Sequence, residues 1–170
     1  LSSARETRAL ELGRNILGKT PDLFRQQFGN ARAQIVGDTN TMAVAGQKVA
    51  EAFAAAGIQC EPPFVFTDPD LYAEYGYVEE LEAALRRHDA IPVAVGSGAI
   101  NDLTKLASHH AGRAYMCVAT AASMDGYTAF GASISYKGSK QTFNCPAPVA
   151  VLADIEIIRN APGDMTGSGY

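Results

Sequence analysis

The 170-residue chain has no basic block, no long apolar run and no pair of closely spaced cysteines. A membrane helix needs roughly 20 consecutive apolar residues, and no segment approaches that length. The formal net charge is −4 and no basic residues cluster, so neither nucleic acid nor a membrane surface is expected as a partner. The opening stretch is charged and lacks the apolar segment of a signal peptide.

The three cysteines, Cys60, Cys117 and Cys145, are odd in number and far apart. A secreted disulfide framework usually has an even number in a shorter chain, so reduced thiols in a cytoplasmic protein are expected. The adjacent His109 and His110 would point in different directions on a helix and could not chelate one ion. No Ser-His-Asp, Cys-His or H-E-x-x-H arrangement is evident, so no catalytic residue and no metal ligand is assigned.

The chain does contain a regular alternation of short apolar runs and amphipathic stretches. Strands that are apolar throughout are typical of a parallel sheet covered on both faces. The pattern predicts an α/β fold with an open, doubly wound, mainly parallel, Rossmann-like sheet, and helices in roughly the first 20 residues. Two β-prone stretches between Ser133 and Cys145, separated by Gly138-Ser139, predict a β-hairpin insertion. The apolar runs are residues 33–36, 64–66, 91–95, 115–118 and 148–153.

Small or polar residues follow each of these runs. In an open parallel sheet, ligands bind beyond the carboxyl ends of the strands. The sequence therefore predicts a site for a polar ligand at this edge. The residues concerned are Gly37-Asp38, Thr67-Asp68, Gly96-Ser97-Gly98, Thr120 and Asp154.

The strongest local signal is Gly96-Ser97-Gly98, where the third run enters a glycine turn and then a helix. Glycine lets the backbone turn tightly and lets a phosphate approach closely. The start of a helix adds free N–H groups and a partial positive charge, which together favour a phosphate. The full G-x-G-x-x-G pattern is absent because Asn101 stands at the third glycine position, so an ordinary tight turn is the alternative.

Each of two carboxylates, Asp102 and Asp38, could either bind a ligand or have a purely structural role. Asp102 could accept a hydrogen bond from a ribose or an amide, or simply favour the helix dipole, and Lys105 could screen a phosphate. Asp38 could bind ribose hydroxyls, as in dinucleotide folds, or cap the next helix. Asp38 and the glycine turn would meet only if the first and third runs are neighbours in the sheet.

Two segments resemble the sn-glycerol-1-phosphate dehydrogenases, which belong to the superfamily of iron-containing alcohol dehydrogenases, glycerol dehydrogenases and 3-dehydroquinate synthases. Residues 95–105, V-G-S-G-A-I-N-D-L-T-K, resemble the family's G-S-G-x-I-N-D segment. Residues 120–127, T-A-A-S-M-D-G-Y, are similar to its T-A-x-S-M-D-G-Y. The resemblance implies reduction of dihydroxyacetone phosphate to sn-glycerol 1-phosphate, or oxidation of a related glycerol-like alcohol, with NAD or NADP.

The resemblance also assigns roles to individual residues. Asp125 would contact the polyol or triose phosphate. A divalent metal (zinc, iron or nickel) would act as a Lewis acid in the full enzyme, with ligands outside this chain, and a homo-oligomer is expected. The residues that would contact the nucleotide are Asp38, Gly96, Ser97, Gly98, Ala99, Ile100, Thr120 and Ser123, to which the local argument adds Asp102.

Two departures from the family pattern concern Ala129 and the end of the chain. Ala129 stands where the family has a serine in contact with the cofactor. The family continues past Ser-Gly-Tyr into Gly-Asp, which carries the first metal ligand, whereas this chain ends at Tyr170. Residues 1–170 are thus expected to be one NAD(P)-binding domain, inactive alone, from an enzyme whose helical metal-binding domain is absent. A 3-dehydroquinate-synthase-like lyase and a stand-alone nucleotide-binding domain are the alternatives.

Overall fold

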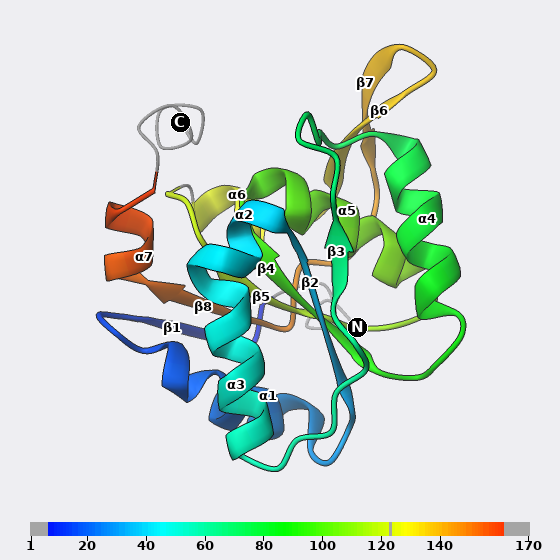
Figure 1. The fold of residues 1–170 in the computed structure, drawn as a ribbon. Helices are drawn as coiled ribbons and strands as arrows, with labels where there is room; N and C mark the ends of the chain where they lie inside the picture. The colour runs from blue at the N-terminus through cyan, green and yellow to red at the C-terminus, as the bar shows by residue number, and fades with distance from the viewer. Residues whose placement is uncertain (1–6, 123, 162–170) are drawn as a thin grey trace.

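The computed structural model describes residues 7–122 and 124–161, and its main feature is a six-stranded, fully parallel sheet. The strand order is β1-β8-β5-β4-β2-β3 (Figure 1). The expected α/β fold with an open, parallel, Rossmann-like sheet is confirmed. The strands are β1 (Ala9–Gly13), β2 (Ala33–Asp38), β3 (Phe64–Phe66), β4 (Ile91–Gly96), β5 (Met116–Ala119) and β8 (Ala150–Asp154).

Helices cover both faces of the sheet (Figure 1). Ile35 packs in a core with residues of α1 and α3, whereas the next residue, Val36, packs with α4 and α5 on the opposite face. This double burial explains why the central strands β4, β5 and β8 are apolar at nearly every position rather than at alternate ones. No described helix has the length and apolar character needed to cross a bilayer. The helical segments are η2 (Leu17–Lys19), α1 (Thr20–Phe28), α2 (Thr39–Thr41), the π-helix η3 (Met42–Gly46), α3 (Gln47–Ala55), α4 (Tyr75–Leu85), α5 (Gly98–His110), α6 (Met124–Thr128) and α7 (Ile155–Arg159).

The predicted hairpin is confirmed as a separate antiparallel pair, β6 (Ala132–Tyr136) and β7 (Ser139–Phe143). Its two-residue turn is Lys137-Gly138, one position before the predicted one. Both turn residues have positive φ, 53° and 82°, as the tight turns of hairpins require.

The prediction of helix throughout the first residues was wrong for Ala9–Gly13, which form the edge strand β1. Each of its residues pairs with β8 in parallel register, from Ala9 with Ala150 to Gly13 with Asp154. Helix-favouring Ala, Leu and Glu dominate this segment, so local propensity pointed the other way. Pairing with a strand far along the chain overrides that preference.

Candidate functional site

The carboxyl ends of β2 and β4 lie side by side, which meets the condition for Asp38 to approach the glycine turn. The two strands are paired, with Val36 opposite Ala94. The chain leaves β2 for β3 on one side and returns to β4 on the other, so the strand order reverses between them. Open α/β sheets bind ligands in the crevice at such a reversal.

Gly96 ends β4, and the packing of the chain itself requires glycine at this position. A Cβ at Gly96 would lie 2.6 Å from Cβ of Ile100 and 2.7 Å and 2.9 Å from its γ carbons. Ile100 is fully buried in the core against α4 and β5, so it cannot move aside. The first glycine of the turn therefore lets α5 start close against the end of β4.

The first turn of α5 presents backbone N–H groups that no described side chain caps. Ser97 is the N-cap residue, with extended backbone, and its side chain makes no capping hydrogen bond. The N–H groups of Gly98, Ala99 and Ile100 have no partner within the helix because of their position in its first turn. Free N–H groups and the helix dipole together form a site for an anion. Because the Ile100 side chain is buried, Ile100 could contact a ligand only through its backbone.

Gly98 is exposed, and nothing in the described structure requires a glycine there. A Cβ at Gly98 would meet no atom within 4 Å, and its φ lies outside the left-handed range. Neither packing nor backbone conformation accounts for this residue. Close approach of a phosphate to the backbone would account for it, because a side chain would occupy the same space.

Thr120, at the end of the neighbouring strand β5, brings a hydroxyl group to the same turn. Its backbone N–H donates to the carbonyl of Gly96 at 3.1 Å. Its side chain is only 4% exposed, and its Oγ1 has no hydrogen-bond partner among the described residues. Because buried hydroxyls are normally paired, a ligand at this edge would supply the missing partner.

The structural role predicted for Asp38 is confirmed. Its Oδ1 accepts a hydrogen bond from the N–H of Thr41 at 2.8 Å, and the Thr41 hydroxyl accepts one from the N–H of Asp38 at 2.9 Å. This reciprocal pair caps α2. Oδ2 makes no hydrogen bond to a described residue, so the cap leaves one carboxylate oxygen for a ribose hydroxyl. The ribose contact itself stays a prediction.

Asp102 and Lys105 lie one helical turn apart on α5 and are directed toward the segment that precedes and begins β6. Burial raises the pKa of the Asp102 carboxyl group to about 6, against the positive charges of Lys105 and Lys140 and a hydrogen bond from the backbone of Ser133. Lys105 is only 1% exposed, and its Nζ donates to the carbonyls of Ala129 at 2.6 Å and Gly131 at 3.0 Å. The suggestion that Lys105 screens a phosphate was therefore wrong, because its ammonium group is occupied elsewhere. A cofactor contact by Asp102 stays a prediction.

We expect Asp102→Asn to stabilise the protein at pH 7 but not at pH 4. The pKa of Asp102 is raised from 3.8 to about 6 on folding. The stability that the neutral carboxyl group contributes is thus fully present below pH 3.8 and is lost as the pH rises through about 6, where the buried group ionises. The neutral amide removes that loss, which amounts to about 3 kcal/mol at pH 7.

Urea denaturation of both proteins at pH 4 and pH 7 measures the difference. Asp22→Asn, at an exposed position in the first turn of α1, is the matched control and should change stability by less than about 0.5 kcal/mol. An equal effect of Asp102→Asn at both pH values would contradict the prediction.

Two predicted residues fall outside this description. Ser123 is not among the described residues, and for Asp125 the structure describes only the backbone, in α6. Their roles toward nucleotide and substrate stay predictions.

Sequence reasoning missed Tyr127 and the pairing of Asn101 with Tyr115. The buried hydroxyl of Tyr127 donates to the Gly96 carbonyl at 3.1 Å, and the Tyr115 hydroxyl donates to Oδ1 of Asn101 at 2.7 Å. Asn101, which stands at the third glycine position, therefore has a structural role in the core. The only sequence signal was a tyrosine at the end of the T-A-A-S-M-D-G-Y segment.

Asp154 lies at the carboxyl edge but has a structural role. Its carboxylate accepts hydrogen bonds from the N–H groups of Asn15, Ile16 and Glu156, at 3.0, 2.8 and 3.0 Å. It thereby caps α7 and ties the chain after β1 to the end of β8. Residues facing the crevice between β2 and β4 are therefore the better candidates for ligand binding.

Comparison with known proteins places this arrangement in a family. The sequence model of the iron-containing alcohol dehydrogenase family matches residues 11–162. A glycerol-1-phosphate dehydrogenase (NAD(P)+) of Halalkalibacterium halodurans is 36% identical over 164 residues, which are 95% of this chain and 41% of the relative. The Pyrococcus furiosus protein of the same name is 32% identical over 163 residues, 95% of this chain and 45% of the relative. The chain thus spans less than half the length of these curated relatives.

Solved structures share the fold. NADH-dependent butanol dehydrogenase A from Thermotoga maritima matches with a TM-score of 0.81 at 14% identity, over 96% of this chain and 46% of that one. Glycerol dehydrogenase from Schizosaccharomyces pombe matches with a TM-score of 0.77 at 17% identity, over 95% and 41%. At these identities the likeness concerns the fold alone.

Proposed function

Because the chain belongs to the iron-containing alcohol dehydrogenase family, we propose that residues 1–170 form the NAD(P)-binding domain of a dehydrogenase for a glycerol-like alcohol or its phosphate. The observation that carries the proposal is the first turn of α5. There the space beside Gly98 is open, Ser97 makes no capping bond, and the buried hydroxyl of Thr120 has no described partner. A pyrophosphate would fill that space and accept hydrogen bonds from the free N–H groups of the turn, and the nicotinamide half of the same cofactor would supply a partner for the Thr120 hydroxyl.

Each part of the crevice has a role in this proposal. The N–H groups of Gly98, Ala99 and Ile100 would hold the pyrophosphate, and the free oxygen of Asp38 would accept from a ribose hydroxyl. Thr120 would bind the nicotinamide half, where the bound cofactor supplies the hydride chemistry. Ser123 and Asp102 are further proposed contacts of the nucleotide, and Asp125 of the substrate.

We propose dihydroxyacetone phosphate as the substrate of the full-length protein, reduced to sn-glycerol 1-phosphate. Support comes from the two sequence motifs and from the names of the bacterial and archaeal relatives. A cytoplasmic location and self-association stay predictions.

The described residues do not provide a metal centre. They contain no group of three or more His, Cys, Asp or Glu side chains that could hold a metal ion. We therefore assign no step of the reaction to a metal held by the described residues. We propose that a metal, whether zinc, iron or nickel, is held by a second domain that the longer relatives have room for.

The test is a measurement of NADH oxidation by the full-length protein with dihydroxyacetone phosphate. Loss of NADH absorbance that requires the triose phosphate, with sn-glycerol 1-phosphate as the product, supports the proposal. A lyase of the 3-dehydroquinate synthase type would give no net oxidation. Binding of NADH without any net oxidation, or no binding at all, would overturn the proposal.

We expect Asp38→Asn to shift the preference from NADH toward NADPH. Removing a carboxylate beside the ribose removes about 1–4 kcal/mol of repulsion with a 2′-phosphate, and we expect the affinity ratio to change about 10-fold. Asparagine is as good an N-cap as aspartate, so stability should not change. Titration with both nucleotides measures the ratio.

Asp89→Asn is the matched control for the Asp38 experiment. Asp89 is exposed and precedes β4, at the amino edge of the sheet and away from the crevice, and its substitution changes the net charge equally. We expect it to leave the nucleotide preference unchanged. An unchanged preference in Asp38→Asn as well would remove Asp38 from the ribose site.

A further inference from the structure

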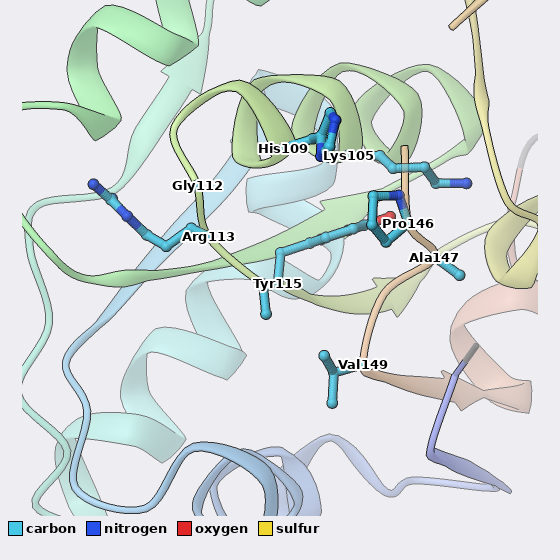
Figure 2. Close-up of a pocket in the computed structure, with 9 residues that line it drawn as sticks. Lys105, His109, Gly112, Arg113, Tyr115, Pro146, Ala147 and Val149 are labelled. Atoms are coloured by element: carbon cyan, nitrogen blue, oxygen red, sulfur yellow. The ribbon is translucent and has the colours of Figure 1, made fainter. Parts of the chain in front are cut away.

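Lys105 is a fully buried lysine whose ammonium group is bonded to backbone carbonyls. Its Nζ donates to Ala129 and Gly131, and none of the salt bridges among the described residues includes it, although the charge of Asp102 partly opposes the lowering of its pKa by burial. Figure 2 shows its side chain extending from α5 in the direction opposite to that of Arg113. Burying an ammonium group costs free energy that an apolar side chain at the same position would avoid. The fold therefore keeps this charge at a cost in stability.

We use "loop 120–128" for the connection after β5, which carries the hydroxyl groups of the T-A-A-S-M-D-G-Y segment and includes the short helix α6. The carbonyls that Lys105 holds lie where the chain leaves this connection. At Gly131 the chain turns with a φ of +93°, and the Gly131 N–H donates to the carbonyl of Cys145 at 2.7 Å. One turn earlier on α5, Asp102 accepts a hydrogen bond from the backbone of Ser133. Two charged side chains of α5, those of Asp102 and Lys105, thus hold the segment that follows the loop.

The other part of the loop is fixed to the glycine turn from which α5 starts. The Thr120 N–H and the Tyr127 hydroxyl both donate to the carbonyl of Gly96, at 3.1 Å each. The loop is therefore tied near both ends to one rigid unit, the end of β4 together with α5. The same unit carries the candidate pyrophosphate site at Gly98.

We propose that Lys105 is a positioning residue, which holds segment 129–131 so that loop 120–128 lies correctly against the first turn of α5. The proposal rests on the proposed function, since this loop would bind the nicotinamide half of the cofactor and the substrate. Lys105 itself touches neither, because its nitrogen is occupied by the backbone. Its loss should therefore disturb the nicotinamide half and the reaction, but not the ADP half of the cofactor.

The surroundings of Lys105 allow side chains of other shapes. A pocket of about 220 Å³ lies along its stem, between α5 and the chain at Pro146 and Ala147 (Figure 2). This pocket is at the amino edge of the sheet, since Tyr115 and Val149 precede β5 and β8. Because this pocket and the nucleotide crevice lie at opposite edges of the sheet, a side chain at position 105 that enters the pocket does not enter the crevice.

The test compares ADP and NADH binding and the steady-state kinetics of Lys105→Met and Lys105→Arg in the full-length protein. We expect Lys105→Met to bind ADP within about 2-fold of wild type and NADH about 10-fold more weakly, because hydrogen bonds that order the loop are lost. We expect kcat to fall about 10- to 100-fold through misplacement of reacting groups. Lys105→Arg, which keeps the charge and the donors, should recover most of both losses.

Other outcomes would overturn the proposal. Equal weakening of ADP and NADH binding, or unchanged kinetics in Lys105→Met, would show that Lys105 only stabilises the fold. If wild type binds neither nucleotide, the proposed function itself fails, which separates the two questions.

A second measurement needs no variant and covers the case in which Lys105→Met does not fold. NADH should slow amide hydrogen exchange at residues 126–131 of the wild type, whereas ADP should not. Equal protection by both nucleotides, or by neither, would also overturn the proposal.

Discussion

We expect Gly98→Val to lower the affinity for NADH by at least about 100-fold while leaving the folded state as stable as wild type. The valine side chain would enter a space beside Gly98 that no protein atom occupies and that a pyrophosphate would fill. Charge-assisted hydrogen bonds to phosphate contribute about 1.5–3 kcal/mol each, and losing two of them weakens binding by that factor. Titration with NADH and thermal unfolding measure the two effects.

The matched control for this substitution is Gly18→Val. Gly18 is also exposed, has no atom within 4 Å of a Cβ, and lies outside the left-handed range. It belongs to η2, which contributes nothing to the crevice between β2 and β4. We expect this control to bind NADH as wild type does. Wild-type affinity in Gly98→Val would refute a pyrophosphate site at the start of α5.

Gly96→Ala is expected to destabilise the protein by about 3 kcal/mol, at the upper end of the cost of overpacking a core. The new Cβ would lie 2.6 Å from Cβ of the buried Ile100, a distance that requires α5 or β4 to move. Because that movement also displaces Ser97 and Gly98, nucleotide affinity should fall with stability.

Gly98→Ala, two residues later, is the comparison that isolates the effect of packing. Since its Cβ meets no atom, alanine should be neutral or stabilise by about 0.5 kcal/mol through the unfolded state. Urea denaturation of both variants gives the difference directly. Equal stability of the two would show that Gly96 is not required by its contact with Ile100.

The amino-acid sequence by itself determined the fold class and predicted the edge of the sheet at which we propose that a ligand binds. Runs such as 91–95 and 148–153 are apolar at every position, as is typical of a sheet buried on both faces. Polar residues after each run marked the carboxyl edge, and the glycine turn before α5 marked the candidate anion site. These signals are local in the chain, so periodicity and composition were sufficient to find them.

The tertiary structure decided what depends on contacts between distant segments. The strand β1 exists because it pairs with β8, against the helix preference of its own residues, and Lys105 is directed to Ala129 and Gly131 rather than to the crevice. The two glycines of the turn look alike in the sequence, yet Gly96 is required by the chain's own packing and Gly98 is not. Which atoms surround a position is a property of the assembled fold, and no local pattern contains it.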